Sequence, residues 1–202
     1  MIPEKKLTEL KREDIIEAAE HEFRTNGFRS TSMDRIAKTA QVSKRTVYNH
    51  FESKESLFQA ISLKLCDSFT HVSDYSYDAG TPIENQLKII AEQQMKLITS
   101  DDFQSTLKMI TTESFASPVL TKENLENFQE SSIGVVKWIT AATEDGKLSV
   151  SDPILAGKQF LALIEAFALW PQLHGFKPTP TKKEQKKIID SAVRMFMNTY
   201  VN

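Results

Sequence analysis

The chain has 202 residues and a formal net charge of −2, with 40% hydrophobic and 26% charged residues. This balance is typical of a globular protein with a substantial apolar core, and the length suits one medium domain or a small domain joined to a larger one. The net charge gives no overall case for nucleic-acid binding, the single cysteine excludes a disulfide framework within one chain, and the absence of any run of about 18 apolar residues argues against a membrane span.

The start of the chain and its cysteine indicate the compartment. Residues 1–11 are charged and lack the apolar core of a secretory signal. Cys66 suits a reducing environment, and its apolar neighbours within a predicted helix favour packing over thiolate chemistry. We therefore expect a cytoplasmic protein.

The first four predicted elements are helices of unequal length. Apolar residues recur at three- and four-residue spacing over 11–26, which predicts an amphipathic helix that Gly27 ends with a left-handed cap. Two short helices follow at about 33–40 and 43–50, separated by a tight two-residue break. A longer helix is predicted over 53–75.

The rest of the chain continues the helical pattern. Further helices are predicted at about 81–100, 103–113, 117–142, 153–175 and 181–200, and a break near Asn124 or Gly134 is an alternative for the third of these. With about nine helices and no convincing strand, the predicted fold class is all-α.

Charge is distributed unevenly along the chain. Residues 57–202 hold 14 Lys and Arg against 17 Asp and Glu, whereas residues 28–54 hold six basic side chains against two acidic ones. The six are Arg29, Arg35, Lys38, Lys44, Arg45 and Lys54. A cationic patch on an otherwise acidic molecule is typical of a compact DNA-binding protein, and a solvated charged face gives the same pattern.

Two short helices joined by a tight break behind a longer helix make a helix-turn-helix unit. Small Ala37 and Ala40 let the helices approach, while Val42 and Val47 bury the underside of the second helix. A recognition helix needs polar groups near its N-terminus, where base edges come within reach. The residues left to face a DNA groove are Ser43, Lys44, Arg45, Thr46, Tyr48 and Asn49. Candidate phosphate anchors at helix starts are Thr31, Ser32 and Ser43.

A longer pattern spans residues 15–58. Its elements are Ala18-Ala19, Phe23, Gly27-Phe28, Thr31, Ile36-Ala37, Ala40, Val42-Ser43, Thr46-Val47-Tyr48, His50-Phe51 and Ser53-Lys54-Glu55. In these residues the segment resembles the DNA-binding domain of the TetR family of regulators. The resemblance implies DNA-facing roles for Lys44, Arg45, Thr46 and Tyr48, a phosphate approach by His50 and a DNA-backbone contact by Lys54.

Two positions depart from the family pattern. Gln41 stands where the family often has glycine in the turn, which is tolerable if the turn residue is not strictly left-handed. Arg45 stands where a small residue is common, which indicates a bulkier and more basic reading surface. Structural alternatives stay open for four DNA-binding candidates: core closure by Tyr48 and His50, a helix cap at Thr31, and a solvated first-turn lysine at Lys54.

The resemblance implies that residues from about 57 form a larger helical domain that dimerises and receives a ligand. Residues 153–175 are apolar on nearly all sides, so a helix there must be buried on more than one face. Gly157 and Ala162 permit close helix approach. The expected dimer interface comprises Leu155, Phe160, Ile164, Phe167, Trp170, Ile189 and Phe196. A monomer with a thick core is the alternative, and the end of this pattern also resembles the AefR-like branch of the family.

Methionines and aromatics of the larger domain suit an adaptable apolar pocket. The candidate pocket residues are Met95, Met109, Phe115, Phe128, Trp138 and Phe167. An ordinary core explains each of them equally well. Glu113 and Glu165 are either polar anchors in such a pocket or exposed residues.

These patterns predict a ligand-responsive transcription regulator. The expected organisation is an arm (1–8), a DNA-binding domain (9–56) and a sensing and dimerisation domain (57–202). We expect a homodimeric repressor that a small apolar or amphipathic effector releases from a near-palindromic double-stranded DNA operator. The alternative is a regulator or architectural DNA-binding protein with no small-molecule ligand. The scattered histidines and missing phosphate loop argue against an enzyme, so no cofactor or metal is expected.

Overall fold

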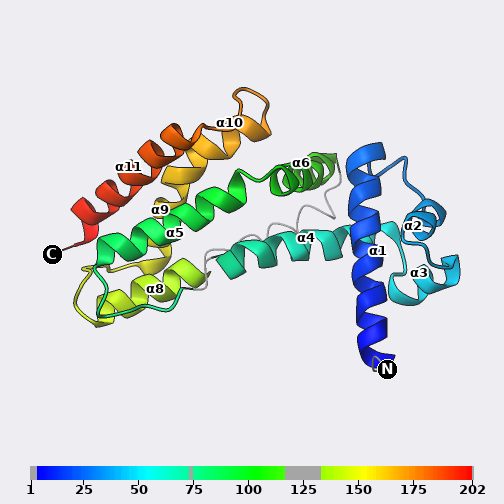
Figure 1. Ribbon diagram of the computed structural model, residues 1–202, viewed down its shortest axis with the longest axis horizontal. Helices are drawn as coiled ribbons and strands as arrows, with labels where there is room; N and C mark the ends of the chain where they lie inside the picture. The colour runs from blue at the N-terminus through cyan, green and yellow to red at the C-terminus, as the bar shows by residue number, and fades with distance from the viewer. Residues whose placement is uncertain (1–3, 73–74, 117–132, 202) are drawn as a thin grey trace. The chain divides into compact units, whose positions relative to one another are not determined.

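The computed structural model describes residues 4–72, 75–116 and 133–201, which form ten helices and no strand (Figure 1). The helices are α1 (Glu4–Asn26), α2 (Met33–Thr39), α3 (Lys44–His50), α4 (Lys54–Val72), α5 (Ile83–Ile98), α6 (Asp101–Ala116), α8 (Ile133–Glu144), α9 (Pro153–Ala168), α10 (Trp170–Leu173) and α11 (Lys182–Tyr200). The all-α prediction is confirmed for this part of the chain. None of these helices is long and apolar enough to cross a membrane.

The chain divides into two compact units. The N-terminal unit comprises Met1–Leu65 and Ser105–Asn127, and the C-terminal unit comprises Cys66–Gln104 and Phe128–Asn202. The division falls within α4 and within α6, so each of these helices contributes to both units.

A cluster of three phenylalanines holds the N-terminal unit together. The ring centroid of Phe28 lies 5.1 Å from that of Phe23 and 5.3 Å from that of Phe58. All three side chains are buried, as are Ile36 of α2 and Val47 of α3. Burial of each such side chain contributes about 1.5–3 kcal/mol, so this small core fixes the short helices against α1.

The first helix is longer than the sequence predicts. It begins at Glu4, so residues 4–8 of the expected arm form its first turns. It ends as expected at Gly27, which has a φ of +80° and donates its N–H to the Phe23 carbonyl.

The turn between α2 and α3 is left-handed. Gln41 has a φ of +54°, and the N–H of Val42 bonds the Ala37 carbonyl at 3.0 Å. A residue with a side chain costs roughly 1–2 kcal/mol in this conformation, which is why glycine is common there. The backbone of Gln41 is therefore strained in the turn that orients α3.

In the C-terminal unit α5, α9 and α11 pack side by side, and α8 packs on α9 (Figure 1). The Phe160 and Phe196 rings meet at 5.2 Å between α9 and α11. Gly157 faces α8 so closely that a Cβ there would lie 3.0 Å from Val135 Cγ1 and 3.2 Å from Val136 Cγ2. The close approach expected at Gly157 is thus made within one chain.

The apolar helix predicted over 153–175 is broken. α9 ends at Ala168, and α10 follows as a separate short helix. Pro171 explains the break, because proline has no N–H for the carbonyl four residues earlier and its ring clashes with that carbonyl. The carbonyl belongs to Phe167 and accepts a hydrogen bond from the side chain of Gln172 at 3.3 Å instead. The single-helix prediction is wrong at this end.

Candidate nucleic-acid interface

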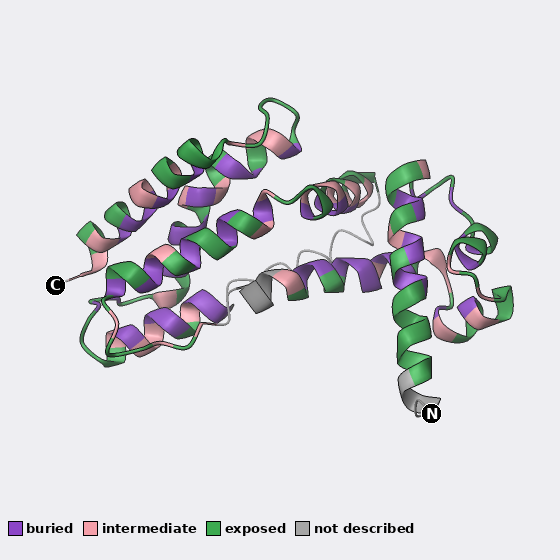
Figure 2. Cartoon of the chain, in the orientation of Figure 1, coloured by how far each residue is buried: buried purple, intermediate pink, exposed green. Residues whose placement is uncertain are grey.

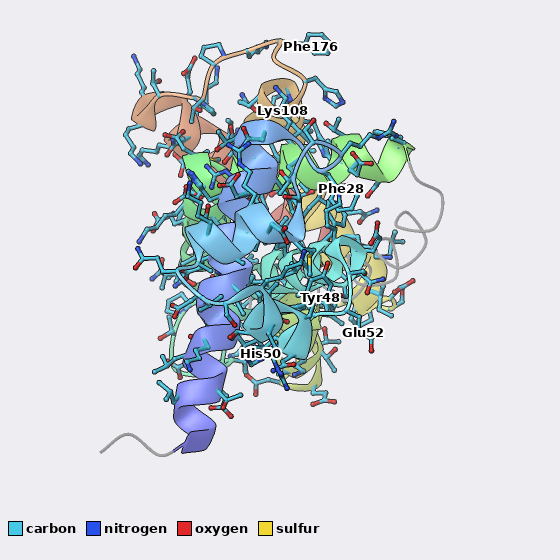
Figure 3. The ribbon with its side chains drawn as sticks, turned by 90° about the vertical axis from the view of Figure 1, so that its right-hand side faces the viewer. Phe28, Tyr48, His50, Glu52, Lys108 and Phe176 are labelled. Carbon is cyan, nitrogen blue, oxygen red and sulfur yellow. The ribbon has the colours of Figure 1, made fainter. Side chains whose placement is uncertain are left out.

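α3 is held by its cap and by one buried residue. The Ser43 hydroxyl accepts the N–H of Thr46 at 3.0 Å and lies 2.8 Å from the Thr46 hydroxyl. Val47 is fully buried beneath the helix, so the residues flanking it turn outward. Figure 3 shows Tyr48 and His50 on this helix and Glu52 beyond its end.

Most of the predicted DNA-binding residues lie at the surface. Ser32, Ser43, Lys44, Arg45, Tyr48 and Asn49 are exposed, and Thr46, His50 and Lys54 are half-buried. The Tyr48 side chain is 45% exposed, so its ring does not close the core. These residues present hydroxyl, amide, guanidinium and ammonium groups, the types that read base edges and phosphates.

Lys44 is already paired in the free protein. Its ammonium lies 2.6 Å from an Asp34 carboxylate oxygen and 5.9 Å from the Tyr48 ring centroid. The hydrogen bond with Asp34 raises the pKa of Lys44, so this side chain stays cationic. A DNA phosphate at Lys44 would compete with Asp34 for this ammonium.

Two of the predicted residues make internal contacts. The Lys54 ammonium donates to the Phe28 carbonyl at 2.9 Å and lies 4.8 Å from the Phe28 ring centroid. The buried Thr31 hydroxyl donates to the carbonyls of Gly27 and Glu22, at 2.9 and 3.2 Å. Both side chains join the end of α1 to the elements that follow, and the N-cap of α2 is Ser32.

Glu22 is a positioning residue that the sequence analysis missed. It lies on the buried face of α1 and is 6% exposed. Its carboxylate accepts from Thr39 Oγ1 at 2.6 Å, Arg35 Nε at 2.7 Å and Asn26 Nδ2 at 2.8 Å. The Thr39 hydrogen bond, aided by Arg35 and Asn26 and opposed by burial, lowers the pKa of Glu22. The sequence did hold a signal for this role, because Glu22 is a charged residue next to Phe23 on the apolar stripe of α1.

The expected pocket residues belong to both units. Met95 and Trp138 are buried in the C-terminal unit, where the Trp138 indole N–H donates to Gln86 at 3.0 Å. Phe115 and Phe167 are 87% and 60% exposed, and Met109 is half-buried. Met109 and Phe115 belong to the N-terminal unit. Phe128 lies outside the described residues.

The expected interface residues divide into two groups. Phe160, Ile164, Ile189 and Phe196 are buried in the core of their own unit, whereas Leu155, Phe167 and Trp170 are exposed. Figure 2 shows this alternation of buried and exposed faces on α9 and α11. Two further apolar side chains, Ile154 and Met195, are exposed on the same two helices.

A helix-turn-helix with an exposed polar recognition helix, joined to a second helical unit, defines the class of one-component DNA-binding regulators. The sequence model of the family described as bacterial regulatory proteins, tetR family, matches residues 15–61. That of the AefR-like transcriptional repressor C-terminal domain matches residues 85–202, more than half of the chain. The chain belongs to the TetR family of transcriptional regulators, whose members are DNA-binding proteins and not enzymes.

Individual relatives agree with this assignment. A TetR family transcriptional regulator from Pseudomonas syringae pv. tomato str. DC3000 is 36% identical, with a TM-score of 0.79 over 94% of this chain and 96% of that one. The Flavonoid-responsive Regulator FrrA is 27% identical, with a TM-score of 0.78 over 96% and 98%. The HTH-type transcriptional regulator YhgD of Bacillus subtilis (strain 168) is 25% identical over 79% of this chain and 84% of its own.

Proposed function

We propose that the chain is a ligand-responsive repressor that binds a near-palindromic operator as a homodimer. The observation that carries the proposal is the exposed polar face of α3, held by the Ser43 cap and by buried Val47. Residues 9–56 act as the DNA-binding domain, and residues 57–202 act in sensing and dimerisation.

The DNA-reading residues of the proposal are those at the exposed start of α3. Lys44, Arg45 and Asn49 supply donors for phosphates and base edges, and Tyr48 supplies an exposed ring and hydroxyl. Ser32 and Ser43 stand where backbone N–H groups of α2 and α3 are free to meet phosphates.

Dimerisation is assigned to the apolar side chains that α9, α10 and α11 leave exposed. Leu155, Phe167 and Trp170 would become buried against a second copy, which removes an apolar surface from water. The two α3 helices of such a dimer must lie roughly 34–36 Å apart, or a multiple of this, to enter successive major grooves.

The effector is assigned to the C-terminal unit. The similarity to a regulator named as flavonoid-responsive supports a flat aromatic or otherwise apolar effector. Because α4 contributes to both units, an effector that prefers one packing around it would change the spacing of the two α3 helices. Release then follows from the different affinities of the effector for the two states.

DNA binding is tested by fluorescence anisotropy on DNA from the region upstream of the protein's own gene, with scrambled DNA as control and a series of salt concentrations. We expect sequence-selective binding that weakens steeply with salt, and a loss of about tenfold or more in the double variant Lys44→Ala, Tyr48→Ala. Lys147→Ala removes an exposed lysine of the C-terminal unit and should bind as the wild type does. Equal binding of operator and scrambled DNA at low salt, with no site recovered from random DNA, contradicts the proposal.

A further inference from the structure

Helix α5 buries two glutamine side chains eight residues apart on one face, Gln86 at 7% and Gln94 at 1% exposure. Gln86 uses both ends of its amide. Its Nε2 donates to the carbonyls of Asp78 and Thr81, at 2.8 and 2.7 Å. Its Oε1 accepts from the Asp78 N–H and from Trp138 Nε1, each at 3.0 Å. The burial of Gln86 therefore has a complete structural reason.

Gln94 uses only one end of its amide. Its Nε2 donates to Glu165 Oε1 on α9 at 3.2 Å. Its Oε1 is buried and has no hydrogen-bond partner among the described residues. Turning the amide end for end would place its oxygen against the carboxyl group and leave the NH₂ unpartnered. In either orientation, one end of the Gln94 amide has no hydrogen-bond partner among the described residues. Buried polar groups without a partner are rare in folded proteins.

Glu165 shares this apolar site. Burial raises the pKa of its carboxyl, and the hydrogen bond from Gln94 only partly opposes that effect. No salt bridge to Glu165 is found in the described part of the chain. Gln94 Oε1, between α5 and α9, is therefore a buried acceptor that lacks a donor among the described residues.

We propose that Gln94 and Glu165 are the polar anchor of the effector site and that they select a neutral hydroxyl group carried on an aromatic body. The hydroxyl donates to Gln94 Oε1, for which the described residues supply no donor. This inference rests on the proposed function, because it assigns the anchor to the site of that same effector. A site built to bond a hydroxyl rejects an analogue that lacks it, since the buried acceptor is then left unpaired.

The test compares two ligands that differ only in the donor. Binding of 7-hydroxyflavone and of 7-methoxyflavone to the full-length protein is measured by calorimetry, and release of operator DNA by anisotropy. We expect the wild type to bind the hydroxyl compound at least tenfold more tightly. Gln94→Leu should lose this preference, and Glu165→Gln should reduce it. Gln93→Leu, at the exposed neighbouring position, should keep it.

The outcomes distinguish failure of the Gln94–Glu165 anchor from failure of the aromatic effector itself. Equal binding of both flavones by the wild type, or an unchanged preference in Gln94→Leu, overturns the anchor and leaves an aromatic effector in place. Binding of neither flavone overturns the hydroxyl assignment together with the aromatic effector.

A measurement without ligand tests the unmet oxygen itself. We expect Gln86→Leu to lower Tm by several degrees, because it frees the Trp138 indole N–H and the 78–81 turn. Gln94→Leu should lower Tm by less than Gln86→Leu does, since it removes one hydrogen bond, to Glu165, together with an oxygen that has no donor among the described residues. A fall in Tm as large as that of Gln86→Leu would show that Gln94 is as fully bonded as Gln86, and would overturn the anchor.

Discussion

Glu22 and Glu165 are glutamates withdrawn from water in different units, and their surroundings are opposite. Three donors, among them Thr39 and Arg35, surround the Glu22 carboxylate and lower its pKa. Glu165 accepts one hydrogen bond from the described residues, from Gln94, and burial raises its pKa. The N-terminal unit satisfies its buried charge with its own side chains, which suits a rigid DNA-reading surface. In the described part of the C-terminal unit, Gln94 Oε1 beside Glu165 has no donor.

The largest expected effect comes from removing the satisfied carboxylate. Glu22→Ala takes away two hydrogen bonds that join α1 to α2 and one within α1, and we expect a loss of about 2–3 kcal/mol in the free energy of unfolding. Urea denaturation followed by circular dichroism measures it. Glu17→Ala, at an exposed position on the same helix, should change stability by less than about 0.5 kcal/mol. Similar losses of unfolding free energy in the two variants would mean that Glu22 does not position α2 against α1.

A comparable test in the C-terminal unit uses its closest helix contact. Gly157→Val inserts side-chain atoms where even a Cβ would lie 3.0 Å from Val135 Cγ1. We expect a loss of about 1–3 kcal/mol from overpacking between α8 and α9. The matched change Ala162→Val, at an exposed position on α9, should be near neutral. A stable Gly157→Val protein would show that α8 can move away.

The pH dependence of stability should separate the two glutamates by sign. Because the folded-state pKa of Glu22 is lowered, its contribution is present above the usual glutamate pKa of about 4.3 and is lost as pH falls through the folded value. Because the pKa of Glu165 is raised, its burial destabilises the fold increasingly as pH rises from about 4.3 through the raised value.

The glutamine variants expose this difference in thermal melts across pH. At pH 7, Glu22→Gln should lower stability by about 1 kcal/mol, an effect that shrinks in acid. Glu165→Gln should raise stability at pH 7, and the gain should shrink as pH falls through the raised folded pKa and be absent below the usual glutamate pKa. Shifts of the same sign in both variants at pH 7 would contradict the comparison.

A change in the turn before α3 should raise the free energy of unfolding, by less than the losses expected above. Gln41→Gly relieves the strain of a residue with φ of +54°. We expect a gain of about 0.5–1 kcal/mol in the free energy of unfolding, partly offset by the extra freedom of glycine in the unfolded chain. Equilibrium unfolding of the two proteins side by side decides it, and a net loss would mean that the Gln41 side chain contributes more than the strain.

The smallest effect concerns the pairing of Lys44. Asp34→Asn removes the carboxylate 2.6 Å from its ammonium without changing the helix. We expect operator affinity to rise about two- to fivefold, because exposed ion pairs are weak competitors. Anisotropy at low salt measures this change, which should shrink as salt is raised. Unaltered affinity would mean that Asp34 does not compete with DNA.

The sequence by itself determined most of the described helices and the helix-turn-helix unit. Apolar spacing of three and four residues placed the helices, and Gly27 and Ser43 marked ends that the structure retains. The pattern also predicted that Val47 is buried beneath α3 and that Lys44 and Tyr48 stay exposed. Helical periodicity and capping depend on neighbours within a few residues, so a sequence reports them directly.

Only the tertiary structure decided which partner each polar or apolar group meets. Glu22 bonds Thr39 seventeen residues away, and Gln94 bonds Glu165 at a separation of 71 residues. Gly157 was expected to permit close packing, yet its neighbour in α8 follows only from the packing of the unit. An apolar stripe predicts that a face is buried but not against what. Whether a buried polar group is satisfied depends on distant atoms, because hydrogen bonds act over about 3 Å in space regardless of distance along the chain.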